Sequence, residues 1–116
     1  MLKPLLQSLP EVDARIRAAN RVALFLDFDG TLAPIVPDPA NAHLSDVVRQ
    51  ALQRVVEHES IVTTVISGRA VEDLYVRIRV DNLIYSGNHG LEIFGRRLAL
   101  RRARGGFAAR PFAASG

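Results

Sequence analysis

The stretch Arg21-Val-Ala-Leu-Phe-Leu-Asp-Phe-Asp-Gly-Thr-Leu32 decides the fold of this 116-residue chain. Its apolar residues 22–26 are followed at once by two aspartates and a glycine, a pattern typical of a strand buried on both faces and closed by a turn. Side chains two residues apart in a strand point the same way, so we expect Asp27 and Asp29 on one side and Phe28 in the interior. Adjacent carboxylates repel each other unless a hard cation such as Mg²⁺ lies between them.

The remaining sequence alternates helical and strand patterns. Apolar spacing predicts three helices, at residues 5–19, 45–59 and 70–79. Apolar and β-branched runs predict further strands at residues 61–66, 83–86 and 91–94, the last on an edge or in a hairpin with residues 97–101. Such alternation is typical of βαβ units, so the expected fold class is α/β with a partial Rossmann-like parallel sheet.

Three polar motifs, at residues 27–31, 67–69 and 87–90, each follow a predicted strand. In parallel sheets, ligands bind beyond the carboxyl ends of the strands. The three motifs are therefore expected to build one site. A carboxylate there can act as a covalent nucleophile, and a hydroxyl beside free backbone N–H groups can hold an anion.

These motifs carry a family resemblance. Asp27-Phe-Asp-Gly-Thr-Leu32 and Ile66-Ser-Gly-Arg69 are similar to the first two motifs of the haloacid dehalogenase superfamily. With Tyr85-Ser-Gly-Asn-His-Gly-Leu-Glu-Ile93 they resemble the trehalose-6-phosphate phosphatases, over residues 20–94. The resemblance implies a Mg²⁺-dependent phosphomonoesterase of trehalose biosynthesis that hydrolyses trehalose 6-phosphate, a small sugar phosphate, through an aspartyl-phosphate.

The resemblance also implies roles for individual residues. Asp27 would be the nucleophile and a Mg²⁺ ligand, and Asp29 the general acid and base, with its backbone carbonyl on the metal. The other candidates would hold the phosphate or, for the last two, the sugar: Gly30, Thr31, Ser67, Gly68, Arg69, Asn88 and His89. Simpler interpretations stay open: turn formers at residues 27–31, a helix cap at Ser67 and an ordinary exposed histidine at position 89.

The charge of the chain is unevenly distributed. The net charge is +3, but residues 95–116 contain six arginines and no acidic residue, which leaves −3 on residues 1–94. We expect two regions: a phosphatase core, N-terminal half, at 1–94, and a disordered Arg/Ala/Gly-rich tail at 95–116. With only two phenylalanines in the tail, nucleic-acid binding has weak support. No apolar run is long enough for a membrane span, and a cytoplasmic protein is expected.

The family pattern continues beyond what this sequence matches. The resemblance implies a cap domain and a second half of the core, which supply a lysine and an acidic pair and place later strands beside the strand that carries Asp27. Lys3 is the only lysine here and matches no motif. We therefore expect a truncated phosphatase with one strand edge unpaired, its missing part absent or on another chain. Two alternatives stay open: a phosphatase for another sugar phosphate, and a non-catalytic fragment that binds phosphate or sugar.

Overall fold

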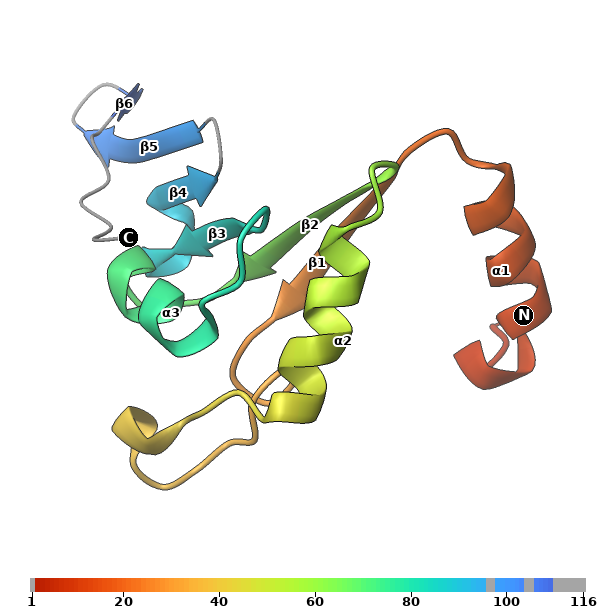
Figure 1. Ribbon diagram of the computed structural model, residues 1–116, viewed down its shortest axis with the longest axis horizontal. Coiled ribbons are helices and arrows are strands. Elements are labelled where there is room, and N and C mark those ends of the chain that lie inside the picture. The colour runs from red at the N-terminus through yellow and green to blue at the C-terminus, as the bar shows by residue number, and fades with distance from the viewer. Residues whose placement is uncertain (1, 96–97, 104–105, 110–116) are drawn as a thin grey trace.

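The computed structural model describes residues 2–95, 98–103 and 106–109. The strands within them form one six-stranded sheet in sequence order from β1 to β6 (Figure 1). They are β1 (Val22–Asp27), β2 (Ile61–Ile66), β3 (Ile84–Gly87), β4 (Glu92–Gly95), β5 (Leu98–Ala103) and β6 (Gly106–Ala109). The predicted strands at 22–27 and 61–66 are confirmed with the same bounds, and β3 and β4 begin one residue later than predicted.

The first three strands are parallel, as expected for βαβ units. β1 pairs with β2 in register from Val22–Ile61 to Asp27–Ile66, and β2 pairs in parallel with β3. The sheet then continues as antiparallel neighbours, β3 to β4, β4 to β5 and β5 to β6. The expected hairpin after β4 is therefore present. The structure has strands β5 and β6 inside 95–116, where the sequence suggested a disordered tail; the rest of that tail lies largely outside the described residues.

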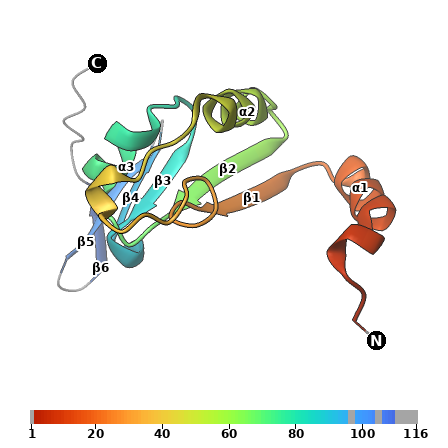
Figure 2. The same ribbon diagram turned by 90° about the horizontal axis from the view of Figure 1, so that it is seen from below.

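Two helices cover one face of the parallel strands (Figures 1 and 2). α2 (Asp46–Val56) begins at Ser45, whose hydroxyl accepts a hydrogen bond from the Val48 N–H, as its N-cap position predicts. α3 (Val71–Ile78) buries Val71, Leu74 and Ile78. α1 (Leu9–Ala18) stands apart from the sheet and buries no residue. None of the described helices is long and apolar enough to cross a bilayer; the cytoplasmic location stays a prediction.

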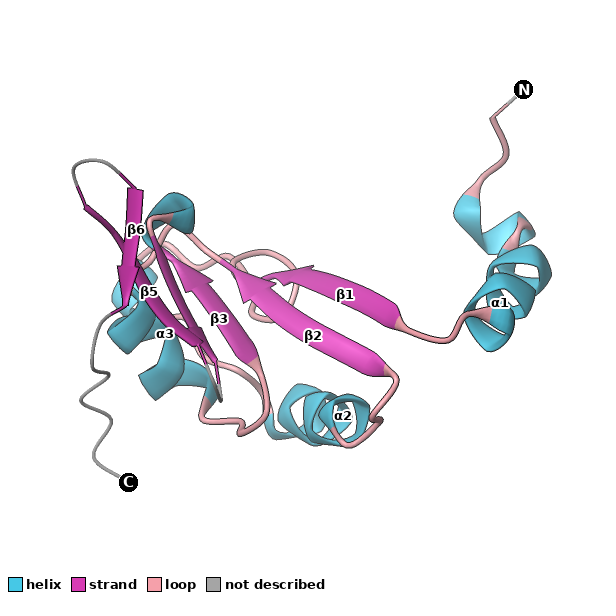
Figure 3. Cartoon of the chain, turned by 90° about the horizontal axis from the view of Figure 1, so that it is seen from above, coloured by secondary structure: helices cyan, strands magenta, loops and turns pink. Residues whose placement is uncertain are grey.

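The burial of β1 differs from what the sequence predicted. Its residues alternate between half-buried and exposed, and the phenyl ring of Phe25 is 64% exposed, so the strand is not buried on both faces. Among the described strands, only β2 lies beside it, and α2 and α3 lie on one side of the sheet (Figure 3). Within the described residues, no strand pairs with the outer edge of β1, and no helix covers its second face.

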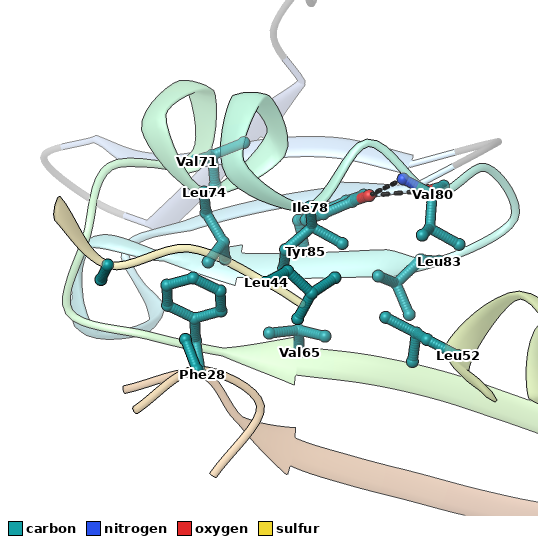
Figure 4. Packing of buried hydrophobic residues seen from close by; sticks show 12 residues of the cluster. Phe28, Leu44, Leu52, Val65, Val71, Leu74, Ile78, Val80, Leu83 and Tyr85 are labelled. Atoms are coloured by element: carbon teal, nitrogen blue, oxygen red, sulfur yellow. Dashed lines mark hydrogen bonds between the residues drawn. The ribbon is translucent and has the colours of Figure 1, made fainter. Parts of the chain in front are cut away.

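The core lies between the sheet and its two helices (Figure 4). Phe28, Val65 and Leu74 are completely buried there. Tyr85, at 1% exposure, donates a hydrogen bond to the Val80 carbonyl at 2.6 Å and accepts one from the Val80 N–H at 3.1 Å. Burial raises the pKa of Tyr85 far above its usual value, because the ring is removed from water. The hydroxyl thus fixes the turn that precedes β3 and its site residues.

Replacing Tyr85 by phenylalanine tests this anchor. The phenyl ring fills nearly the same volume, but both polar groups of Val80 lose their partner in a buried place. We expect the free energy of unfolding to fall by about 1–3 kcal/mol, the cost of buried unsatisfied groups. Urea denaturation monitored by circular dichroism measures it. An unchanged midpoint would show that the hydroxyl does not hold the turn.

Candidate functional site at the carboxyl ends of β1, β2 and β3

The turn after β1 places the two aspartates as predicted. Phe28 is fully buried, while Asp27 and Asp29 on either side of it are exposed. Gly30 adopts a φ of +84°, which side chains rarely tolerate, and its N–H donates to the Ala33 carbonyl at 2.7 Å. This glycine is therefore required by the turn itself. Its conformation returns the chain tightly and leaves both carboxylates at the end of the sheet.

Arg69 joins the first and second motifs. Its Nη2 and Nε donate to the two carboxylate oxygens of Asp29 at 2.8 and 3.1 Å, a bidentate pair across forty residues of sequence. Nη2 also donates to the Pro39 carbonyl, and the guanidinium lies 5.6 Å from the ring centre of Phe28. The hydrogen bond with Asp29 raises the pKa of Arg69 despite its partial burial. Arg69 was expected on phosphate; here it holds the predicted general acid.

The third motif packs against the second. The Asn88 N–H donates to the Arg69 carbonyl at 2.6 Å, and the His89 N–H donates to the Ser67 carbonyl at 3.2 Å. A Cβ built on Gly68 would lie 2.6 Å from Cε1 of His89, so the imidazole covers that glycine. Backbone contacts thus bring the second and third motifs together, and the Arg69 side chain brings in the first. The three motifs therefore lie side by side at this end of the sheet, as the topology predicted.

Ser67 is not a cap of the following helix. Its side chain is buried, and its hydroxyl accepts a hydrogen bond from the Arg69 N–H at 3.0 Å, whereas α3 begins after Ala70 without a side-chain cap. The hydroxyl proton stays available for another acceptor. Along the β1–β2 ladder, Asp27 pairs with Ile66, the residue before Ser67. Thr31 lies exposed in the turn after β1, with its N–H donating to the Phe28 carbonyl.

Two further site residues were missed in the sequence. Asp73 accepts hydrogen bonds from Arg69 at 3.3 Å and from Arg77 at 3.1 Å. Arg77 in turn donates to the carbonyls of Ala40 and Ala42, which ties the segment between β1 and α2 to α3. The signal was present as an Arg-Asp-Arg series at spacings of four, the spacing of ion pairs on one helix face. We call these three side chains the Arg69–Asp73–Arg77 network.

The network predicts a pH dependence of stability. Burial alone would raise the pKa of Asp73, but the hydrogen bonds and charges of Arg77 and Arg69 outweigh it and lower that pKa. A lowered folded-state pKa stabilises the fold above the unfolded value of about 3.9, and the contribution is lost as pH falls through the folded value. We therefore expect the unfolding free energy to fall less steeply below about pH 4 in Asp73→Asn than in the wild type.

Urea denaturation at a series of pH values measures this difference in slope. Asp13→Asn is the matched control, because Asp13 forms its ion pair with Arg17 on exposed α1, where such pairs contribute little. Identical acid slopes for the wild type and Asp73→Asn would exclude the network as a stabilising element. An equal change in both variants would show that the effect is not specific to the site.

The site offers both a cavity and oxygen ligands. A cavity of about 420 Å³ is lined by residues that include Asp29, Pro39, Gly68 and Arg69, within the size range of small-molecule sites. No cluster of three or more acidic or histidine side chains suited to a metal occurs in the described part of the chain. The exposed carboxylates of Asp27 and Asp29 are oxygen ligands of the kind that Mg²⁺ takes, and this ion keeps several waters and often binds only one or two protein carboxylates.

Known proteins are similar to this chain in sequence. A sequence profile of the Trehalose-phosphatase family matches residues 25–97. Trehalose 6-phosphate phosphatase RA3 of Zea mays is 41% identical over 90 residues, which cover 76% of this chain and 24% of that protein. Probable trehalose-phosphate phosphatase 3 of Oryza sativa subsp. japonica is 40% identical over 76 residues, 66% of this chain and 20% of that protein.

Solved structures agree. A trehalose-6-phosphate phosphatase of Aspergillus fumigatus superposes with a TM-score of 0.67 at 32% identity, covering 73% of this chain and 32% of that one. The C-terminal domain of the C. albicans enzyme gives a TM-score of 0.74 at 28% identity, covering 83% and 34%. The chain spans about a fifth to a quarter of the curated relatives it matches. In sequence and in fold, the chain belongs to the trehalose-phosphatase family.

Proposed function

We propose that this chain supplies the nucleophile and the phosphate-binding segments of a trehalose-6-phosphate phosphatase. One observation carries the proposal: hydrogen bonds join the segments that follow β1, β2 and β3 at one end of the sheet. The substrate identity rests on the relatives, whose names specify trehalose phosphate.

The reaction follows from the residues of this site. The Asp27 carboxylate attacks phosphorus, the bond to the sugar oxygen breaks, and an aspartyl-phosphate forms. Asp29 donates a proton to the departing sugar oxygen and later takes one from the water that hydrolyses the aspartyl-phosphate. The phosphoryl oxygens would accept hydrogen bonds from the Ser67 hydroxyl, and from Arg69 once its guanidinium turns from Asp29 to the phosphate.

A bound Mg²⁺ would neutralise charge on the phosphoryl oxygens, held by the Asp27 carboxylate and the Asp29 carbonyl. Removing it tests the assignment. Phosphate release from trehalose 6-phosphate should stop in excess EDTA and return when Mg²⁺ is added, whereas Ca²⁺ should restore little, because it prefers longer bonds and more ligands. Release that is indifferent to EDTA would contradict a role for the metal.

The proposal is tested by phosphate release from trehalose 6-phosphate, compared with glucose 6-phosphate and other sugar phosphates. Selective release supports a trehalose-phosphate phosphatase, and equal release from all substrates indicates a less specific sugar-phosphate phosphatase. The second candidate is a fragment that binds without turnover. It is favoured by the position of Lys3, the only lysine of the chain, which is exposed and pairs with Glu11. Calorimetric binding of trehalose 6-phosphate without phosphate release would support this second candidate.

A further inference from the structure

Asp73 lies one contact away from the predicted general acid. Its carboxylate accepts a hydrogen bond from Nη1 of Arg69 at 3.3 Å, and the same guanidinium donates through Nε and Nη2 to Asp29. The guanidinium is therefore held between two carboxylates, one from the turn after β1 and one from α3. The Arg69 side chain is only 13% exposed, so water competes little for these donors.

The two carboxylates use different donors of Arg69. A guanidinium has five N–H donors in a planar fork. Those on Nε and Nη2 form the edge that faces Asp29, and Nη2 also donates to the Pro39 carbonyl at 2.8 Å. Asp73 contacts Nη1, outside that edge. A phosphate in place of the Asp29 carboxylate would bind the Nε–Nη2 edge, because that edge matches two oxygens of either group. The contact with Asp73 can then persist.

Asp73 is itself fixed in position. The Nε of Arg77 donates to both of its carboxylate oxygens, at 3.2 and 3.1 Å. Arg77 is anchored in turn by the carbonyls of Ala40 and Ala42, at 3.0 and 2.8 Å. The Asp73 carboxylate thus lies between two arginines, Arg69 and Arg77, whose like charges would repel each other without it.

Asp73 differs from an ordinary ion pair on a helix surface. Asp13 and Arg17 have the same spacing of four residues on α1, but their side chains are 61% and 79% exposed. Arg69 and Arg77, the partners of Asp73, are 13% and 14% exposed and also bind backbone carbonyls. A guanidinium that is fixed on several sides holds one orientation, whereas a solvated pair contributes little.

We propose that Asp73 is a positioning residue of the phosphatase reaction, an inference that rests on the proposed function. It keeps Nη1 of Arg69 in place while the Nε–Nη2 edge passes from Asp29 to the phosphoryl group. The guanidinium then turns about a fixed point, and the arrival of the phosphate frees Asp29 for its proton transfer. Such placement matters, since a misplacement of about 1 Å can cost about a hundredfold in rate.

The first experiment measures steady-state phosphate release from trehalose 6-phosphate. Asp73→Ala should lower kcat about tenfold and change KM by less than about threefold, because phosphate still binds the guanidinium but meets it in varied orientations. Asp73→Asn keeps an oxygen that can accept from Nη1 and should recover part of the loss. The matched control, Asp13→Ala, should keep both constants. An unchanged kcat in Asp73→Ala, or a change confined to KM, would overturn the proposal.

The second experiment needs no turnover, so it separates a failure of this inference from a failure of the proposed function. In NMR spectra of the full chain, the Nε–Hε signal of Arg69 should be sharp in the wild type. In Asp73→Ala it should broaden and exchange faster with water, while the backbone amide signals stay those of the folded chain. An unchanged Nε–Hε signal would overturn the inference. Broadening in Asp73→Ala without any phosphate release by the wild type would support the contact and contradict the proposed function.

Discussion

Asparagine in place of Asp27 should lower phosphate release from trehalose 6-phosphate by about 10⁴-fold or more, as expected when the nucleophile of a covalent mechanism is removed. The amide has nearly the same shape as the carboxylate, so the turn around buried Phe28 should survive. A carboxamide oxygen is too weak a nucleophile to form the aspartyl-phosphate. Steady-state phosphate release measures the loss.

Asp81→Asn is the control for this prediction. It removes an exposed carboxylate from the turn that precedes β3, at the opposite end of that strand from the site. Its rate should equal that of the wild type. Comparable circular dichroism spectra of the two variants exclude unfolding as the cause of a lost rate. Full activity in Asp27→Asn would refute the covalent mechanism.

Alanine in place of Phe28 should lower the free energy of unfolding by about 3–5 kcal/mol, because it leaves a cavity in the core. The ring is completely buried between the two exposed aspartates and lies beneath the Arg69 guanidinium. The same substitution therefore removes the ring against which the Arg69 side chain of the site packs. Urea denaturation measures the free energy of unfolding. The decrease should be a large part of the total free energy of unfolding of a small domain.

Phe25→Ala provides the comparison within the same segment of chain. Phe25 is 64% exposed, so its removal should change the free energy of unfolding by less than about 1 kcal/mol. Equal losses in Phe25→Ala and Phe28→Ala would contradict the assignment of Phe28 to the core. Unchanged stability in both variants would also contradict the assignment of Phe28 to the core.

The order of elements followed from the sequence because local patterns determine it. Alternating runs and turn residues gave the strands at 22–27 and 61–66 with the bounds that the structure has. One wrong prediction, the burial of the first strand on both faces, concerns the neighbours of an element and not the element itself. Apolar residues at 22–26 are compatible with a strand buried on one face or on both, because periodicity does not show which other elements pack against the strand.

In the candidate site too, local patterns predicted where residues lie along the chain but not which side chains contact each other. Spacing placed Asp27 and Asp29 at the end of β1 and set Ser67–Arg69 near them, since parallel strands end together. It did not reveal that the Arg69 side chain binds Asp29, because a long guanidinium side chain can reach many acceptors. Asp73 and Arg77 were missed although their spacing is regular. Exposed ion pairs on helices show the same spacing, and only the carbonyls of Ala40 and Ala42 reveal this pair as part of the site.

The contact between Gly68 and His89 has a consequence for how the protein tolerates change. The space that a side chain at position 68 would occupy is filled by a ring from a different segment, twenty-one residues away. Enlarging Gly68 even to alanine would require the exposed imidazole of His89 to rotate away from that space. The two segments are joined more firmly by their backbones, because the His89 N–H donates to the Ser67 carbonyl, so a ligand that displaces the backbone of one segment also strains the other.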